Sequence, residues 1–281
     1  ASWCETRLVK TKCRGWDFCT TAMSLNLIVE VLETNGLLYV ALTALTAGIV
    51  RGFSGFGTAM IFLPVAGKYF EPVTAIIVLT IMDLCGPALI VPKALRDAYK
   101  PDLVRLIGGM VITLPIALYF LMNMETEIFR YIVSILALIL ILVLSTGWRF
   151  HRQLNSGALI GLGGIAGVSG GIAGVPGPPV ILFYMASIHP VKVIRANNLL
   201  FLFGFDIFAL FFLSIASALN VSAVILGLIL AIPMGLGNIV GAVLFNPDKE
   251  KLYRKIAFLI ITLSAITGLP FLSDNFDSFV G

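Results

Sequence analysis

Charged residues are scarce in this sequence. Aspartate, glutamate, lysine and arginine make up 12% of the 281 residues, whereas hydrophobic residues make up 59%. An average soluble domain contains roughly 25% charged residues. So little charge cannot cover the apolar side chains of a water-soluble fold, and the composition therefore excludes an ordinary soluble domain.

The sequence also lacks the usual motifs for metals, nucleic acids and nucleotides. It has two histidines and four cysteines, without a CxxC or a Cys/His zinc spacing. The basic residues behind the net charge of +4 occupy short segments between apolar runs and form no aromatic-interleaved patch for nucleic acid. The run 161–166 has a dinucleotide-like glycine spacing but no strand context. We expect no cofactor, no metal and no nucleic-acid partner.

The first 22 residues differ from everything that follows. They are polar and contain Cys4, Cys13 and Cys19, whereas Cys85 lies in an apolar run. They lack the apolar middle of a signal peptide. We expect residues 1–22 to be a tail that is non-native or processed, with Met23 as a candidate natural start. A disulfide or a redox role for the three tail cysteines is the alternative.

Long apolar runs without charge make up most of the remaining chain. A helix that spans a bilayer needs roughly 20 mostly apolar residues. The runs 106–124, 131–148, 153–188 and 207–247 contain no charged residue. The sequence therefore predicts an all-α, multi-pass protein of the cell inner membrane, with the lipid bilayer as its surroundings.

The second half of the chain repeats the first. Gly48, Gly52 and Gly55 match Gly167, Gly171 and Gly174 at an offset of 119, and Pro72, Gly86, Gly109 and Pro115 match Pro190, Gly204, Gly227 and Pro233 at an offset of 118. Each half has a glycine-broken pair of short segments followed by three full helices. The expected segments are 37–50, 58–70, 72–95, 102–122 and 127–148, then 157–169, 177–188, 191–218, 221–246 and 252–272. We divide the chain into two membrane repeats, 23–152 and 153–281, that form one domain.

Basic residues in short loops predict the orientation, because such loops prefer the cytoplasm. Loops 123–127 and 218–221 have no lysine or arginine, whereas four other segments hold 12 of the 19 basic residues: Lys93, Arg96, Lys100 and Arg105; Arg149 and Arg152; Lys192 and Arg195; Lys249, Lys251, Arg254 and Lys255. All these loops can lie on their expected sides of the membrane only if each broken pair is re-entrant, which means that it enters and leaves on one face. The halves are then inverted relative to each other, which is typical of secondary transporters with alternating access. If the tail is native and cytoplasmic, residues 25–50 instead form a crossing helix.

Two glycine-rich loops interrupt apolar segments at matching positions of the repeat, at 51–58 and 170–179. Unwound backbone in lipid costs on the order of several kcal/mol for each unpaired group, so such breaks persist only where something satisfies them. A glycine loop that opens into a half-helix aims its N–H groups and positive dipole end at one point, which suits an anion. We predict that Thr58 and Gly177 approach each other at the bilayer midplane with the anion between them.

The alternative is that these glycines only permit close helix packing, since Gly48-x-x-x-Gly52 and Gly167-x-x-x-Gly171 fit a small-xxx-small spacing. Two loops at matching repeat positions favour the binding site. The residues that we expect to contribute from the two loops are Gly52, Ser54, Gly55, Gly57, Thr58, Gly171, Gly174 and Gly177.

The paired motifs resemble those of the sulfite exporter TauE/SafE family. The likeness covers roughly residues 37–272 and rests on Gly52-Phe53-Ser54-Gly55-Phe56-Gly57 with Pro64, and on Gly171-Ile172-Ala173-Gly174 with Val175-Pro176-Gly177-Pro178-Pro179. The resemblance implies transport of sulfite, sulfonates or related sulfur-containing organic anions, in a family that includes exporters and uptake permeases. Many relatives have a triple glycine where this chain has Gly57-Thr58-Ala59 and Pro176-Gly177-Pro178. Because proline lacks an N–H, the second loop offers an anion fewer backbone donors than the first.

Two acidic residues lie inside predicted membrane helices. Asp83 is near the middle of 72–95 and Asp206 near the middle of 191–218, although they do not occupy equivalent positions of the repeat. A charge at such a depth costs at least about 2.5 kcal/mol. The functional interpretation is a proton or cation relay that couples to anion movement. The alternative is that each carboxyl is a hydrogen-bonded strut between helices.

Further polar residues lie near the predicted loops. Arg51 adjoins the first glycine loop and could counter the charge of an anion, or it could reach the outer interface. Arg195, Asn197 and Asn198 begin the helix after the second hairpin, where they could line an inner vestibule, with Arg195 alternatively a cytoplasmic anchor. Ser54, Thr58 and Ser169 add hydroxyl groups that could instead bond their own helix. His189 and His151 are predicted to be interfacial rather than catalytic, and Asn238 to be either packing glue or lumen lining.

The leading hypothesis is therefore a secondary active transporter, acting as an exporter of small sulfur-containing anions and coupled to a proton or another cation. It is not predicted to be an enzyme, because no HExxH motif is present. An uncoupled anion channel could use the same loops. An intramembrane aspartyl-type enzyme would have to use Asp83 and Asp206. Glycine-rich helix faces permit a homodimer.

Overall fold

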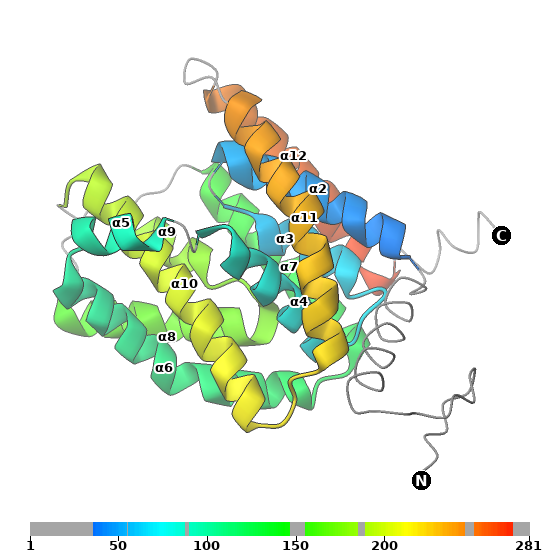
Figure 1. Ribbon diagram of the computed structural model, residues 1–281, viewed down its shortest axis with the longest axis horizontal. Helices are drawn as coiled ribbons and strands as arrows, with labels where there is room; N and C mark the ends of the chain where they lie inside the picture. Colours follow the sequence, from blue (N-terminus) through cyan, green and yellow to red (C-terminus); the bar gives the residue numbers. More distant parts are fainter. Residues whose placement is uncertain are drawn as a thin grey trace, which may run out of the picture.

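The structure is a computed structural model that describes residues 36–54, 56–87, 90–146, 155–184, 189–244 and 250–271. These residues form helices and no strand (Figure 1). The helices are α2 (Leu37–Ser54), α3 (Thr58–Ala66), α4 (Pro72–Cys85), α5 (Val91–Asp97), α6 (Lys100–Met122), α7 (Thr126–Ser145), α8 (Ser156–Ala173), α9 (Gly177–Tyr184), α10 (Val191–Ile215), α11 (Val221–Leu244) and α12 (Glu250–Gly268). The expected all-α fold is confirmed. The tail with its three cysteines, Met23, and the loop that contains His151 lie outside the described residues.

Six of the described helices are long and apolar enough to cross a membrane. They are Leu37–Ser54, Lys100–Met122, Thr126–Ser145, Ser156–Ala173, Lys192–Ile215 and Val221–Leu244. The apolar segments Pro72–Cys85 and Lys255–Gly268 are shorter. The helices α3 and α9 have only 9 and 8 residues. The chain is therefore a multi-pass membrane protein that also contains helices too short to cross alone.

One predicted helix was wrong in its length. The segment 72–95 is divided into α4, which ends at Cys85, and α5, which begins at Val91. Gly86 and Pro87 follow the end of α4, and Pro92 stands in the first turn of α5. A proline inside a helix removes one backbone hydrogen bond and its ring collides with the carbonyl four residues earlier. The two prolines therefore favour a break at a place where hydropathy alone predicts a continuous span.

The two predicted hairpin breaks are present. Gly57 precedes α3 with a φ of 101°, and Gly174 follows α8 with a φ of 65°. Side chains other than glycine rarely adopt a positive φ, so these two positions depend on glycine to turn the chain. The long first helices continue further into the loops than predicted, to Ser54 and to Ala173.

The most extensive helix pairs are α6 with α8 and α2 with α11 (Figure 1). Each pair joins the first helix of one hairpin to a helix of the other half. In the first pair, a Cβ at Gly109 would overlap the Ile160 carbonyl oxygen. In the second, a Cβ at Gly48 would overlap the Met234 carbonyl oxygen, and one at Gly237 would overlap the Leu45 carbonyl oxygen. Glycines thus let two helix backbones touch, the usual device for helix association in membranes.

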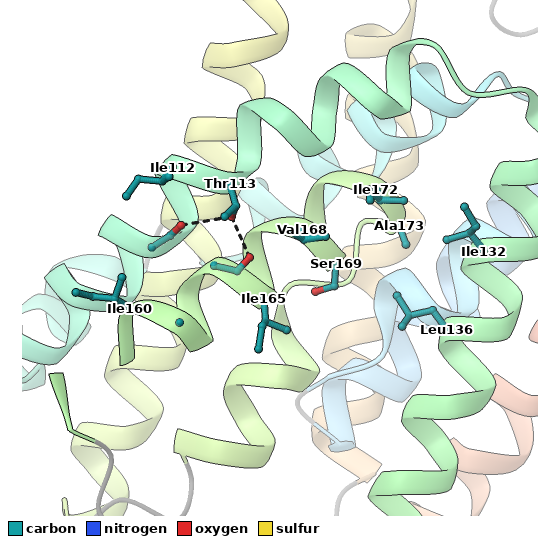
Figure 2. Close-up of a pocket in the computed structure, with 13 residues that line it drawn as sticks. Ile112, Thr113, Ile132, Leu136, Ile160, Ile165, Val168, Ser169, Ile172 and Ala173 are labelled. Carbon is teal, nitrogen blue, oxygen red and sulfur yellow. Dashed lines mark hydrogen bonds between the residues drawn. The ribbon is translucent and has the colours of Figure 1, made fainter. Parts of the chain in front are cut away.

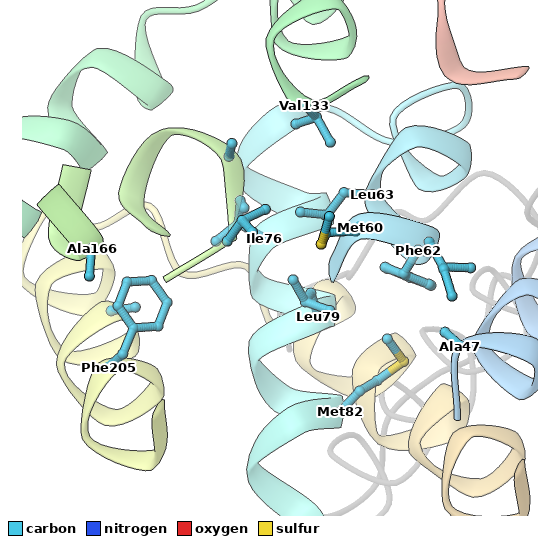
Figure 3. Packing of buried hydrophobic residues seen from close by; sticks show 14 of the residues in the cluster. Ala47, Met60, Phe62, Leu63, Ile76, Leu79, Met82, Val133, Ala166 and Phe205 are labelled. Atoms are coloured by element: carbon cyan, nitrogen blue, oxygen red, sulfur yellow. The ribbon is translucent and has the colours of Figure 1, made fainter. Parts of the chain in front are cut away.

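The apolar core surrounds the short helix α3 and its neighbour α4. Met60, Phe62 and Leu63 of α3 are almost fully buried, as are Ile76 and other residues of α4. Figure 3 shows these side chains together with Val133 of α7, Ala166 of α8 and Phe205 of α10, which belong to the same buried cluster. On the far side of α3, the Ser264 hydroxyl of α12 donates a 2.6 Å hydrogen bond to the Ile61 carbonyl oxygen. The hairpin helices are therefore held from several sides.

Side-chain contacts mark the ends of both hairpins. The rings of Tyr39, in the first turn of α2, and Tyr69, just after α3, stack with centroids 6.5 Å apart. In the second hairpin, Tyr184 at the end of α9 donates a hydrogen bond to Asp102 in the first turn of α6. Because Gly163 of α8 packs on Leu106 and Gly171 on Ala117, α8 and α6 run in the same direction and begin side by side.

Candidate functional site

Arg51 lies at the centre of a charged cluster beside the first hairpin break. Its Nη1 atom is 2.5 Å from Oδ1 of Asp83 on α4 and 3.4 Å from Oγ1 of Thr58, the first residue of α3. The two charged side chains keep 18% and 22% of their surface exposed, whereas Thr58 is buried. The break thus combines a cation, a carboxylate and a hydroxyl at the start of a short helix.

Asp206 of α10 belongs to the same cluster. The residue is 8% exposed and lies close enough to both Asp83 and Arg51 to interact with their charges. The guanidinium therefore pairs with one carboxyl group and interacts electrostatically with a second, from the other half of the chain. A second carboxylate near an existing ion pair is unfavourable unless a proton or another cation compensates it.

The two hairpin breaks differ in exposure. Residues 51–54, 56 and 57 of the first break are all partly exposed. Residues 173–180 of the second break are all buried. Gly174 packs against Leu63 of α3 and Ile76 and Leu79 of α4, and Gly177 faces Leu202 of α10. Only the first break therefore combines polar side chains with access from outside the protein.

The predicted hydroxyl donors are occupied by their own loops. The Ser54 hydroxyl is 2.6 Å from the Val50 carbonyl oxygen and 2.8 Å from that of Phe56. The Ser169 hydroxyl lies 3.1 Å from the Val175 carbonyl oxygen. Both side chains thus replace backbone hydrogen bonds that the breaks leave unmade. This agrees with the alternative stated from the sequence, in which these hydroxyl groups bond their own helix.

The predicted glycines fall into two groups. Gly52 and Gly171 lie in helix contacts, where a Cβ at Gly52 would overlap the Asn238 carbonyl oxygen and one at Gly171 would lie 2.5 Å from the Cβ atom of Ala117. Gly57, Gly174 and Gly177 are at the breaks themselves, and Gly55 lies outside the described residues. Close packing therefore accounts for Gly52 and Gly171, whereas both interpretations of the Asn238 side chain remain predictions.

Thr58 and Gly177 have different neighbours. Thr58 contacts Arg51, whereas Gly177 faces Leu202. Gly52, just before the first break, packs beside Ala242, close to the C-terminal end of α11 at Leu244. These contacts place the first break beside the end of a long helix rather than beside its middle. The meeting of Thr58 and Gly177 at the midplane remains a prediction.

Asn197 belongs to a second polar cluster, which the sequence analysis missed. Its Nδ2 atom donates to the Tyr184 hydroxyl at 2.6 Å and to the Tyr99 carbonyl oxygen at 3.1 Å. Asp102 accepts from Tyr184 at 3.3 Å, and His189 Nε2 lies 3.0 Å from the same carboxyl group. Asp102 in a first helical turn and Tyr184 in an apolar segment each have an ordinary local explanation, so neither stood out.

Arg195 and Asn198, the other two residues predicted beside Asn197, take different positions. Arg195 is exposed, in keeping with a surface anchor. The Oδ1 atom of Asn198 is buried and has no hydrogen-bond partner among the described residues. The three residues therefore do not converge on one point.

A cavity of about 690 Å³ lies elsewhere, between α6, α7 and α8. Figure 2 shows it lined by apolar side chains, with Thr113 donating a 2.9 Å hydrogen bond to the Gly164 carbonyl oxygen of α8. Its lining residues Ile112 and Ile165 are 67% and 59% exposed. The cavity is an outward-facing groove of the apolar surface and contains no charged group that could bind an anion.

The comparisons with known proteins give one match. The sequence model of the family described as "Sulfite exporter TauE/SafE" matches residues 40–268. No curated protein and no solved structure matches the chain. The match covers most of the chain, from the first turn of α2 to the last residue of α12, and includes both hairpins and the charged cluster.

Proposed function

Because the chain belongs to the sulfite exporter TauE/SafE family of membrane transporters, we propose that it exports sulfite, organosulfonates or related small sulfur-containing anions across the inner membrane by secondary active transport. The observation that carries this proposal is the position of Arg51. Its guanidinium is the charged group of the first hairpin break, and it is shared between Thr58 and Asp83.

Arg51 is suited to a sulfite or sulfonate group. A guanidinium presents several N–H donors in one plane and binds oxyanions through paired hydrogen bonds. The Thr58 hydroxyl, 3.4 Å from the guanidinium, adds a donor at the same place. The free N–H groups at the start of α3 add the positive end of a helix dipole, although α3 is short.

Asp83 competes with the anion for Arg51. While the carboxylate is ionised, it occupies the guanidinium at 2.5 Å, and an arriving anion would meet the negative charges of Asp83 and Asp206. A proton on either carboxyl group removes one negative charge, so that a monovalent anion can enter with no change in the total charge of the cluster. This exchange would link the binding of one proton to the binding of one monovalent anion.

The hairpin geometry supports alternating access. Tyr39 and Tyr69 lie together at the ends of the first hairpin, and Asp102 and Tyr184 join the start of α6 to the end of the second hairpin. With the basic segments on the cytoplasmic side, the first hairpin would enter from outside and the second from inside. We propose that the two re-entrant, inverted halves rearrange around the charged cluster.

The test is flux of labelled sulfite and sulfoacetate into proteoliposomes, with and without a pH gradient. The native protein should give saturable flux that a gradient accelerates and that can accumulate anion. In Asp83→Asn, Arg51 is free without a proton, so flux should persist but lose most of its response to the gradient. The control is Asp97→Asn, since Asp97 pairs with Lys192 at 2.8 Å, outside the cluster.

The outcomes separate transport from other activities. Flux that never saturates and cannot drive accumulation would identify an anion channel. Absence of flux for both anions, with the protein folded, would contradict the assignment of sulfur-containing substrates. An Asp83→Asn variant with the native gradient response would remove Asp83 from coupling and leave Asp206 as the candidate.

A further inference from the structure

A second group of ionisable side chains lies at the end of the second hairpin, away from Arg51. We name it the hairpin-end network and define it by Tyr99, Asp102, Tyr184, His189 and Asn197. The carboxylate of Asp102 is its centre. Oδ2 is 3.3 Å from the Tyr184 hydroxyl and 3.0 Å from His189 Nε2, and Oδ1 accepts from Arg105 at 3.2 Å.

The hairpin-end network joins three helices. Asp102 is on α6, Tyr184 ends α9, and Asn197 is in the first turns of α10. Asn197 donates to Tyr184, and it accepts a 2.9 Å hydrogen bond from the backbone N–H of Tyr99. Asn197 and Tyr184 are essentially fully buried. The same helix α10 carries Asp206 to the charged cluster, so a movement of α10 at one point is transmitted to the other.

His189 is more exposed than the carboxyl group that it contacts. Its side chain is 22% exposed, against 11% for Asp102. The Tyr99 ring lies 4.6 Å from the imidazole, and Tyr184 faces it from α9. Arg105 on α6 pairs with Asp102, and Asp97 of α5 pairs with Lys192 of α10, whereas α8 has no ionisable side chain.

Two kinds of contact hold the second hairpin to α6. Along α8 the contact is glycine against backbone, at Gly163 and Gly167, and it contains no group that changes its charge. At the end of α9 the contact is made by hydrogen bonds to Asp102. Histidine is the side chain that ordinarily changes its charge between about pH 5 and 8. The second contact can therefore respond to protons while the first stays fixed.

We propose that Asp102 and His189 form a second proton-binding site, which holds α9 and α10 against α6 when His189 is protonated and releases them when it is neutral. The imidazolium adds an ion pair to its hydrogen bond with the Asp102 carboxylate, whereas the neutral ring offers the hydrogen bond alone. The proposal rests on the proposed function in one respect, since it assigns to this site the regulation of anion transport through α10 and Asp206.

The test measures opening without any substrate. Leu103, next to Asp102 on α6, is 8% exposed. In protein whose four native cysteines are replaced by serine, Leu103→Cys is labelled with a charged methanethiosulfonate reagent in proteoliposomes at pH 6 and pH 8. The comparison is the same protein with His189→Gln, in which the amide still donates to Asp102 but cannot be protonated.

The labelling rate at pH 8 divided by the rate at pH 6 should be at least fivefold larger in the His189 protein than in the His189→Gln protein. In the His189→Gln protein, this ratio reports the ionisation of the thiol alone. Equal ratios in the two proteins would overturn the proposal. Arg51→Gln removes flux, but the pH-dependent change in labelling should still be larger in the His189 protein than in the His189→Gln protein. Failure of the anion site and failure of the proton site are thus distinguishable.

Discussion

The two hairpin breaks have the same backbone plan and opposite chemistry. Each follows an 18-residue helix, turns at a glycine with positive φ, and opens into a helix of 8 or 9 residues. The first break is partly exposed and holds Arg51 against Asp83. The second is buried among apolar side chains, and the polar groups of its hairpin lie at the far end, around Asp102. A repeated architecture therefore does not require a repeated site.

The difference follows from the cost of charge in an apolar medium. An ionised side chain is tolerated there only beside a partner or water. The first break has both, because Arg51 and Asp83 pair and remain partly exposed. The second break, lined by Leu63, Ile76 and Leu79, could accept neither a charge nor an anion without rearranging. The first break thus suits a charged ligand, whereas the second break suits an apolar wall.

The largest effect is expected from removing the positive charge at the first hairpin break. Arg51→Gln leaves Asp83 without its ion partner and removes the proposed anion ligand. Losing one member of a buried charge pair costs about 2–5 kcal/mol, or a factor of at least about 30 in binding. We expect sulfite flux to fall by about 100-fold or more in proteoliposomes.

The matched control is Arg130→Gln on α7, whose guanidinium donates to the Gly268 carbonyl oxygen at 3.2 Å, outside the cluster. Its flux should stay close to native. Equal losses in the two variants, with both folded by size-exclusion chromatography, would mean that Arg51 acts only through general stability.

A second prediction tests whether the helix packing, unlike the chemistry, is common to both hairpins. Gly109→Ala and Gly237→Ala each place a Cβ on a carbonyl oxygen of the partner helix, at Ile160 and Leu45. Overpacking of this kind costs typically about 1–3 kcal/mol. We expect both variants to unfold at lower temperature in detergent, by similar amounts.

Neighbouring glycines provide the controls. A Cβ at Gly108 or at Gly235 would have nothing within 4 Å. Gly108→Ala and Gly235→Ala should therefore be neutral or slightly stabilising, since alanine favours a helix more than glycine does. A lower unfolding temperature in only one of the two test variants would show that the contacts α6–α8 and α2–α11 do not contribute equally to stability.

Much of the fold could be predicted from the sequence. Uncharged apolar runs determine helices almost by themselves, and the glycine and proline matches between halves locate both breaks. The division of 72–95 at Gly86 was missed because hydropathy is insensitive to a proline that follows a glycine. The sequence marks Asp83 and Asp206 as costly charges and Arg51 as a candidate counter-charge for an anion, yet their separate positions in the chain do not reveal that they form one cluster.

The hairpin-end network was missed for a different reason. Asp102 stands in a first helical turn, where the helix dipole favours an acidic residue, and Tyr184 ends an apolar run. Each has a sufficient local explanation. Their bond joins positions 82 residues apart, and it depends on the tight packing of α6 on α8. Contacts of this kind follow from the assembled helices rather than from any local pattern.

The smallest expected effect concerns the one carboxyl group that the second half contributes to the first break. Asp206→Asn removes a negative charge near Asp83 and Arg51 but leaves their ion pair in place. If Asp206 carries the coupled proton, the variant should transport sulfoacetate at equal pH within about threefold of the native rate, because binding at Arg51 persists. A threefold change corresponds to roughly 0.7 kcal/mol, well below the cost of losing Arg51. The acceleration by a pH gradient should disappear. An undiminished gradient response in Asp206→Asn, together with its loss in Asp83→Asn, would confine both anion binding and coupling to the first half.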